Sequence, residues 1–393
     1  MKLFRSLAPV ALAAALLAAC GGGDPDVPGS GSPAGAPTTR GTFTSVVSFG
    51  DSLSDVGAYT PATVIPGTNP PVYIGGKFTT NSATGTVWVE NLATTLGLTV
   101  TAAEVGFAGT SVKCPAAAVP ALASTCTAYG QGGARVTDPN GVGKSSGALT
   151  VPVVTQIDNH LARFGNFQSS DLILVWAGNN DAFVQFAAFG AAAAQIQAQA
   201  ATGAISVDEA NRQLFAAQTA AQEGMKVAAL ELAGYVRTKI LANGGKYVAV
   251  MTLTDIADTP FGGSLPANVR PVLTSLSEIF NLWLREGLTG QPVAIIDTFA
   301  ASKSVLANAA ALGLTNTTTP ACDAAAISVI TSGQITDGSS LFCNSTVGAP
   351  YYGLAAGASA TTYLFADGVH PTTGGHKAIS DDIARRLQAL GWI

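Results

Sequence analysis

The sequence predicts an α/β protein of three layers, in which helices cover both faces of a central parallel sheet. Two observations carry this prediction. Short apolar runs rich in β-branched residues are bounded by turn residues, which is typical of buried strands. Helical patterns separate these runs, and strands that alternate with helices form parallel sheets. The 393 residues fit one elaborated domain of this class.

Five runs are predicted as strands, and the second is the weakest: Ser45–Phe49, Leu98–Val105, Leu172–Trp176, Tyr247–Leu253 and Val293–Asp297. The main helical patterns are Thr86–Leu96, Val207 to about Ala242, Ala267–Leu288 and Gly375–Leu390. In open parallel sheets, ligands bind beyond the carboxyl ends of the strands. We therefore expect functional residues in the turns that directly follow the apolar runs.

Two insertions are expected within this domain. A helical insertion at about 184–243 starts with an Ala- and Gln-rich stretch, and its long helix opens at Ser206 in a capping box with Glu209. We interpret it as a helical hairpin that packs on the core, the alternative being a cover over the ligand cleft. A second insertion, at about 309–357, carries two cysteines and is interpreted as a disulfide-pinned loop.

The N-terminus is typical of an exported protein. Residues 1–19 combine basic residues with an apolar stretch that is too short to span a bilayer. Leu17–Cys20 resembles the bacterial lipobox, in which the signal is removed before a cysteine that becomes lipidated; an ordinary secretory signal is the alternative. Residues 20–42 have the composition of a flexible linker before a domain at 43–393. We expect a bacterial envelope protein anchored to a membrane through Cys20, in the outer membrane or facing the periplasm.

Composition narrows the classes of partner and of cofactor. The formal net charge is −5 and no basic cluster occurs, which disfavours nucleic acid as a partner. Apart from Cys20, the chain has an even number of cysteines, which in an exported protein predicts two disulfides: Cys114, Cys126, Cys322 and Cys343. Three pairings of these cysteines remain open. The local pairing, Cys114 with Cys126 and Cys322 with Cys343, would close two small loops. Zinc is not expected, because no two cysteines lie two to four residues apart.

A serine, a base and a carboxylate stand in two short motifs. Ser52 directly follows the first apolar run, and Asp367-Gly-Val-His370-Pro lies far downstream. A serine hydroxyl becomes nucleophilic only when a base lies within hydrogen-bond reach, and that base needs a group to orient its other nitrogen. An aspartate three residues before a histidine can form such a pair within one tight turn. The combination is typical of serine hydrolases, with Ser52, His370 and Asp367 in these roles.

Other candidates are given lesser roles. His160 is predicted to be a surface residue on a helix, and His376 to cap or pack at the start of the last helix. Asp51 and Asp55 are expected to support the turn around Ser52. The stretch Gly143–Gly147 formally fits a Gly-x-Ser-x-Gly nucleophile elbow, but it follows a turn where the elbow requires a strand.

Together these motifs resemble the GDSL or SGNH-type serine esterases and lipases of bacteria. The resemblance runs from about Ser45 to the C-terminus in the order of the family's blocks, with Trp88–Leu92 similar to a helix after the first block. The blocks are Gly50–Asp55, Tyr129–Arg135, Gly178–Asp181 and Asp367–Thr372.

The resemblance implies a flavodoxin-like SGNH fold and hydrolysis of carboxylic esters through an acyl-enzyme, without a metal or an organic cofactor. It also implies an oxyanion hole made of the backbone N–H groups of Ser52 and Gly133 and the side-chain amide of Asn180. Gly132 is the alternative glycine, because Ala128 stands where the family commonly has asparagine.

Two further readings of the chain stay open. The chain could be an acyltransferase that uses the same acyl-enzyme. It could also be an envelope lipoprotein that binds a glycan or a partner protein and catalyses no reaction. The apolar insertions and the expected lipid anchor favour a hydrophobic acyl ester or a lipid as substrate. Nothing in the sequence predicts the oligomeric state.

Overall fold

The computed structural model describes residues 43–65 and 68–393. The predicted signal segment 1–19, the lipidation site Cys20 and the linker 20–42 lie outside the described residues. The central sheet has four parallel strands in the order β1-β4-β5-β6. Their bounds are β1 Ser45–Gly50, β4 Asp171–Trp176, β5 Tyr247–Met251 and β6 Ala294–Ile296. Four of the five predicted runs therefore form the sheet.

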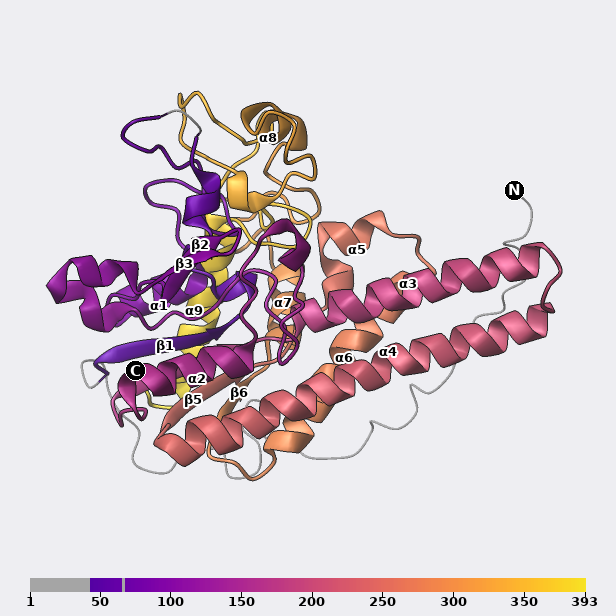
Figure 1. Ribbon diagram of the computed structural model, residues 1–393, viewed down its shortest axis with the longest axis horizontal. Coiled ribbons are helices and arrows are strands. Elements are labelled where there is room, and N and C mark those ends of the chain that lie inside the picture. The colour runs from indigo at the N-terminus through magenta and orange to yellow at the C-terminus, as the bar shows by residue number, and fades with distance from the viewer. Residues whose placement is uncertain (1–42, 66–67) are drawn as a thin grey trace.

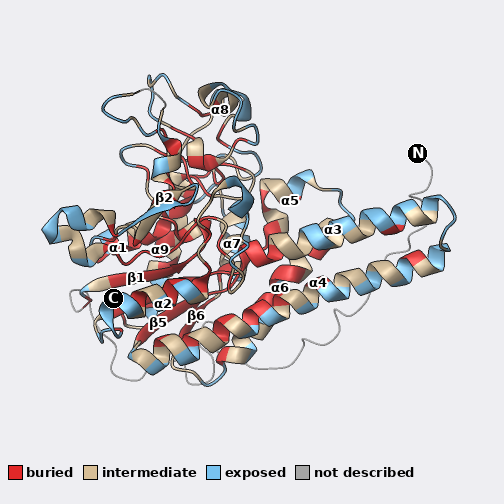
Figure 2. Ribbon diagram, in the orientation of Figure 1, coloured by how far each residue is buried: buried red, intermediate tan, exposed pale blue. Residues whose placement is uncertain are grey.

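Helices cover the sheet on both faces, as the fold class predicts (Figure 1). On one face α1 and α9 pack through residues such as Trp88 and Ile383, and on the other α2, α4 and α6 pack through residues such as Leu232 and Phe280. The strands are buried from both sides (Figure 2). The helices are α1 Trp88–Thr95, α2 Val153–Phe164, α3 Asn179–Ala201, α4 Val207–Tyr235, α5 Pro260–Ser264, α6 Arg270–Leu288, α7 Thr298–Ala307, α8 Ala324–Ile330 and α9 Thr373–Ala389.

The run Leu98–Val105 is the exception, and its prediction as a strand of the sheet was wrong. Strand β2 (Glu104–Phe107) instead pairs with β3 (Thr110–Lys113) in a separate antiparallel hairpin. The edge of β1 is bordered by a short stretch, in which Ala128 forms single bridges to Ser48 and Ala102. This stretch stays beside β1 up to the end of the strand, where the N–H of Gln131 donates a 3.2 Å hydrogen bond to the carbonyl oxygen of Gly50.

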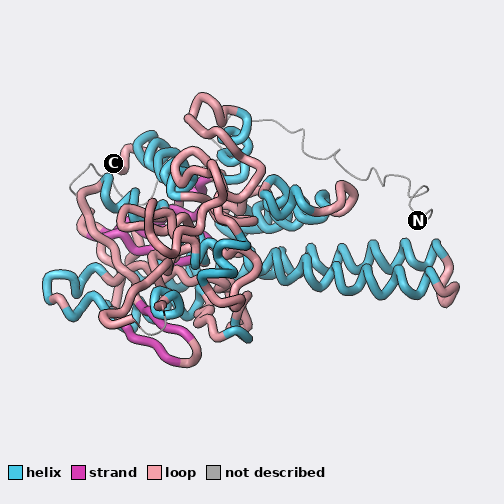
Figure 3. The backbone as a smooth tube through the Cα atoms, turned by 90° about the horizontal axis from the view of Figure 1, so that it is seen from above, coloured by secondary structure: helices cyan, strands magenta, loops and turns pink. Residues whose placement is uncertain are grey.

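Helices α3 and α4 form the predicted hairpin, and its outer half extends away from the body of the protein (Figure 3). The side chain of Ser206 accepts a 3.1 Å hydrogen bond from the N–H of Glu209, so the cap at the start of α4 is confirmed. Only the inner half packs on the core, where Met225 and Leu232 are fully buried. Among the described residues, no helix has both the length and the apolar character needed to cross a membrane.

The cysteines pair locally. Cys114 is bonded to Cys126, and Cys322 to Cys343, so the two predicted disulfides are confirmed and the pairing that the sequence left open is decided. The second bond lies in the loop insertion, which also contains α8 and a small apolar cluster around Ile327. This insertion is therefore a packed unit beside the sheet edge.

Candidate active site

Ser52 lies at the carboxyl end of β1 because the chain turns sharply there. The turn begins at Asp51, whose carboxylate accepts a 3.1 Å hydrogen bond from the N–H of Leu53 and so caps the 3₁₀ turn Ser52–Ser54. The residue before it, Gly50, has no room for a side chain, since a Cβ would lie 2.2 Å from the carbonyl oxygen of Trp176. Close packing of β1 on β4 thus places the serine at the edge of the sheet.

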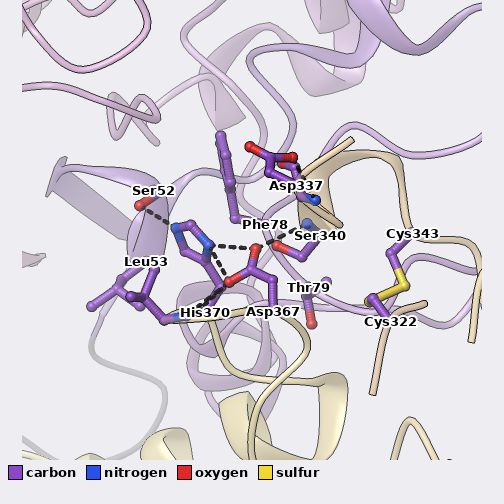
Figure 4. A network of polar contacts seen from close by, with 12 residues as sticks. Ser52, Leu53, Phe78, Thr79, Cys322, Asp337, Ser340, Cys343, Asp367 and His370 are labelled. Atoms are coloured by element: carbon purple, nitrogen blue, oxygen red, sulfur yellow. Dashed lines mark hydrogen bonds and ion pairs between the residues drawn. A yellow bond between two sulfur atoms is a disulfide. The ribbon is translucent and has the colours of Figure 1, made fainter. Parts of the chain in front are cut away.

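Three predicted residues form one chain of contacts (Figure 4). The Nε2 atom of His370 lies 2.8 Å from the Oγ of Ser52. Its Nδ1 atom lies 2.9 and 2.8 Å from the two carboxylate oxygens of Asp367. The Oδ1 atom of Asp367 also accepts the N–H groups of Val369 and His370 at 2.9 and 2.8 Å, which closes the tight turn that the sequence predicts.

The contact between Asp367 and His370 shifts both pKa values. Burial alone would raise the pKa of Asp367, but the charge of His370 and hydrogen bonds from His370, Ser340 and Val369 lower it well below its usual range. Burial would lower the pKa of His370, yet the charge and hydrogen bond of Asp367 raise it above 6.5. The carboxylate therefore stays ionised and the imidazole binds a proton readily.

The two candidate glycines differ in whether their backbone N–H groups are already hydrogen-bonded. The N–H of Gly132 donates a 2.9 Å hydrogen bond to Asp55, so it is already engaged. Within residues 43–65 and 68–393, the N–H groups of Gly133 and Ser52 have no hydrogen-bond acceptor, and both residues line the same cavity. Asn180 lines it as well, and its Nδ2 atom donates to the carbonyl oxygen of Ala134 at 2.9 Å. Ser52, Gly133 and Asn180 therefore line one cavity, and of the two candidate glycines Gly133 is the one whose N–H is not engaged.

The cavity beside Ser52 has a volume of about 990 Å³ and a mostly apolar lining. Aromatic side chains form part of this lining: Phe78, Phe107, Phe183 and Phe261. Apolar side chains of α7, of α9 and of the segment before α9 also line the cavity, and we name these five residues the apolar arm: Val305, Leu306, Leu364, Phe365 and Ile379. Asn179, Asn180 and Phe183, at the start of α3, are the described residues of the helical hairpin that contribute, so the hairpin does not cover the cavity.

Comparison with protein-family models finds a match to the GDSL-like lipase/acylhydrolase family over residues 46–383. The chain belongs to this family. The match begins in β1 and ends in α9, so it contains the whole site. No individually curated protein shows significant similarity to the chain. Members of the GDSL family are in general acylhydrolases, which places this protein among enzymes that act on esters, and the observed architecture agrees with the SGNH hydrolase fold.

Two residues beside Asn180 connect blocks of this GDSL-family chain that are distant in sequence. The amide of Asn179 donates a 3.0 Å hydrogen bond to Asp51. The carboxylate of Asp181 accepts from the N–H of Val136 at 3.0 Å and from the Nε of Arg135 at 2.9 Å. The partners of these two residues lie in the nucleophile turn and in the glycine block. The spacing of polar and apolar residues along the chain does not reveal hydrogen bonds between residues that are so far apart in the sequence.

Asp55 connects the same two blocks from the other side. Its buried carboxylate accepts N–H groups of Gly57, Ala58 and Gly132 at 2.9, 2.6 and 2.9 Å. Burial outweighs these hydrogen bonds and raises its pKa to about 6. The predicted role in the turn is confirmed, and the bond to Gly132 extends it to the glycine block.

The two remaining histidines are both buried. His376 accepts from the N–H of Trp88 and contacts the carbonyl oxygen of Phe78, each at 3.3 Å, so its predicted packing role is confirmed. His160 was predicted at the surface, and this was wrong, because its side chain is only 2% exposed. It lies on the same face of α2 as Ile157, and its ring stacks on Phe167 with centroids 4.4 Å apart. The polar residues that precede it in the sequence point away from that face.

Two further segments bear on the site. The stretch Gly143–Gly147 contains only a 3₁₀ turn with no strand before it, as expected of a motif that is not a nucleophile elbow.

The backbone N–H of Ser340 donates a 2.9 Å hydrogen bond to Oδ2 of Asp367. Sequence reasoning missed Ser340, because a backbone donor in an insertion has no sequence signature.

Proposed function

We propose that this protein hydrolyses carboxylic esters through a covalent acyl-enzyme on Ser52. The observation that carries the proposal is the continuous contact from Ser52 through His370 to Asp367, with distances of 2.8 to 2.9 Å, at the wall of a large cavity. A hydroxyl, an imidazole and a carboxylate in this order are the parts of a serine nucleophile.

The first half of the reaction forms the acyl-enzyme. Ser52 Oγ attacks the ester carbonyl carbon while Nε2 of His370 takes its proton. The negative charge that develops on the carbonyl oxygen is stabilised by the N–H groups of Ser52 and Gly133 and by the amide of Asn180. When the tetrahedral intermediate collapses, His370 gives the proton to the leaving alcohol. Asp367 stays ionised and holds the imidazolium.

In the second half, water replaces the alcohol. His370 takes a proton from the water, whose oxygen attacks the acyl carbon, and then returns a proton to Ser52 as the carboxylic acid leaves. The aromatic side chains and the apolar arm of the lining support an ester with a sizeable apolar acyl group as substrate, since burial of apolar surface drives binding to such a lining.

A fatty-ester series tests the proposal. The full chain, with its disulfides formed, is assayed on p-nitrophenyl esters from acetyl to palmitoyl beside Ser52→Ala and His370→Ala. We expect both variants to lose about 10⁴-fold or more in kcat. Ser145→Ala changes the exposed serine of the elbow lookalike and is the matched control, which keeps full activity. A folded Ser52→Ala variant with wild-type activity would refute the mechanism.

Product analysis separates hydrolysis from the two alternatives. With an added acceptor alcohol, a hydrolase yields mainly the free acid, whereas an acyltransferase yields mainly the new ester. A wild type that turns over no ester and is not labelled at Ser52 by a fluorophosphonate would favour the binding-only reading.

We also propose that the protein is exported and anchored through lipidated Cys20. The two local disulfides support an oxidising compartment. Metabolic labelling with a radioactive fatty acid tests this: label is expected in the wild type and absent in Cys20→Ala. Equal labelling of both proteins would contradict the anchor.

A further inference from the structure

The loop insertion supplies a contact to the carboxylate of Asp367. The Oδ1 atom of Asp367 takes its backbone donors, Val369 and His370, from its own turn. The Oδ2 atom accepts the N–H of Ser340 at 2.9 Å, from the 3₁₀ turn Ser340–Phe342 in the insertion. Among the described residues this is the only backbone donor to Oδ2. The insertion therefore supplies one of the three backbone hydrogen bonds that orient the carboxylate toward His370.

A disulfide ties that turn to the segment that carries Asp367. Cys343 directly follows the Ser340–Phe342 turn and is bonded to Cys322. The N–H of Cys322 donates a 2.9 Å hydrogen bond to the carbonyl oxygen of Ala366, the residue before Asp367. The disulfide thus links the backbone next to Asp367 to the turn whose Ser340 N–H binds the Asp367 carboxylate. Figure 4 shows the disulfide and Ser340 on the side of Asp367 away from Ser52.

Asn81 holds the same turn through hydrogen bonds of its side chain and its backbone. Its side-chain amide donates to the carbonyl oxygens of Ser340 and Cys343 at 2.9 and 3.3 Å, and its backbone N–H donates to Cys343 at 2.8 Å. Asn81 is 7% exposed, so these contacts are shielded from water. The turn is consequently fixed between Asn81 and the disulfide.

We propose that Asn81 and the Cys322–Cys343 disulfide are positioning elements of the catalytic triad, which hold the Ser340 N–H against Asp367 and keep the carboxylate aligned with His370. The inference rests on the proposed esterase function and adds the insertion to its machinery. Neither Asn81 nor the disulfide touches the reacting atoms, so they act through Asp367. A displacement of about 1 Å in such a support can cost on the order of 10²-fold in rate.

The test compares the two disulfides of the full chain. The double variant Cys322→Ser/Cys343→Ser frees the Ser340 turn, whereas Cys114→Ser/Cys126→Ser removes the other disulfide, whose cysteines lie outside the cavity lining. Both are assayed on the best p-nitrophenyl ester, well below their melting temperatures, at equal folded concentration. We expect kcat to fall by about 10- to 10²-fold in the first variant with little change in KM, and the control to keep its kcat.

A pH profile separates positioning from simple stabilisation. Asp367 is the main group that raises the pKa of His370, with smaller effects from Asp51 and Asp55, which the variants leave unchanged. If Asp367 loses its alignment, the pKa of His370 falls, and the acidic limb of kcat/KM moves to lower pH. A merely structural role would lower the folded fraction and leave this limb in place.

A second variant covers failure of the first to fold. Asn81→Leu removes the amide donors to Ser340 and Cys343, together with the amide's contacts to Lys77 and Thr79 in its own segment. Leucine has the same branching and the same number of non-hydrogen side-chain atoms, and the disulfide stays intact. We expect the same loss of kcat and the same shift of the acidic limb. A folded variant of either kind with the wild-type kcat and pH profile would overturn the inference, while an active wild type beside an inactive Ser52→Ala would leave the esterase proposal standing. An inactive wild type would remove both.

Discussion

The side-chain nitrogen of Asn180 donates a 2.9 Å hydrogen bond to the carbonyl oxygen of Ala134. An amide nitrogen carries two hydrogens, so this bond uses one of them, fixes the plane of the amide and leaves the second for a ligand. Asn180 lines the cavity beside Ser52 and is 6% exposed. A donor that is fixed before substrate binds needs no reorganisation when charge develops on the ester oxygen.

The first prediction follows from this arrangement. Asn180→Ala is expected to lower kcat by about 10²–10³-fold with little change in KM, because the lost hydrogen bond strengthens in the transition state. Steady-state kinetics on a p-nitrophenyl ester measures this effect. The exposed Asn166→Ala is the control and is expected to behave as the wild type. A change in KM alone would mean that Asn180 binds substrate without contributing to the chemical step.

The second prediction concerns the stability of the fold. Neither ring nitrogen of buried His160 has a hydrogen-bond partner among the described residues. Burial, helped by the charge of nearby Arg163, lowers its pKa from 6.5 to about 4. His160→Phe removes the unsatisfied nitrogens from an aromatic cluster and is expected to raise the free energy of unfolding at pH 7 by about 1–3 kcal/mol. Urea denaturation monitored by circular dichroism measures it.

The lowered pKa of His160 also predicts how the stability advantage of His160→Phe changes with pH. Between pH 6.5 and about 4 the unfolded chain binds a proton at His160 and the folded protein does not, so His160 lowers the stability of the wild type as the pH falls through this window. The advantage of His160→Phe is therefore expected to be larger at pH 5 than at pH 7. An advantage that shrinks toward pH 5 would show that the histidine is protonated in the folded state.

The third prediction concerns the apolar arm of the cavity lining. Leu306→Trp and Ile379→Trp each enlarge a side chain of this lining, so the kcat/KM for the palmitoyl ester is expected to fall by about 10-fold or more while that for the acetyl ester stays nearly unchanged. Val329→Trp places the same ring on a residue that is 81% exposed and outside the cavity lining, as a control. An equal loss along the whole ester series would mean that the acyl chain lies elsewhere.

Local patterns were sufficient for the framework of the fold. Short apolar runs rich in β-branched residues favour buried strands of a parallel sheet, and four of these runs form β1, β4, β5 and β6. Leu98–Val105 has a similar composition but forms no strand of the sheet, because pairing also requires a partner edge of matching length, and the neighbouring chain at Ala128 forms only single bridges.

The sequence by itself determined the residues of the candidate site, because Ser52 follows a strand directly and Asp367 and His370 share one turn. Only the tertiary structure decided which N–H group is free, since Asp55 engages Gly132 and leaves Gly133 available. It also decided that Ser340 supports the acid. These outcomes depend on hydrogen bonds between segments that are far apart in the chain, and their formation depends on the paths of loops that residue periodicity does not encode.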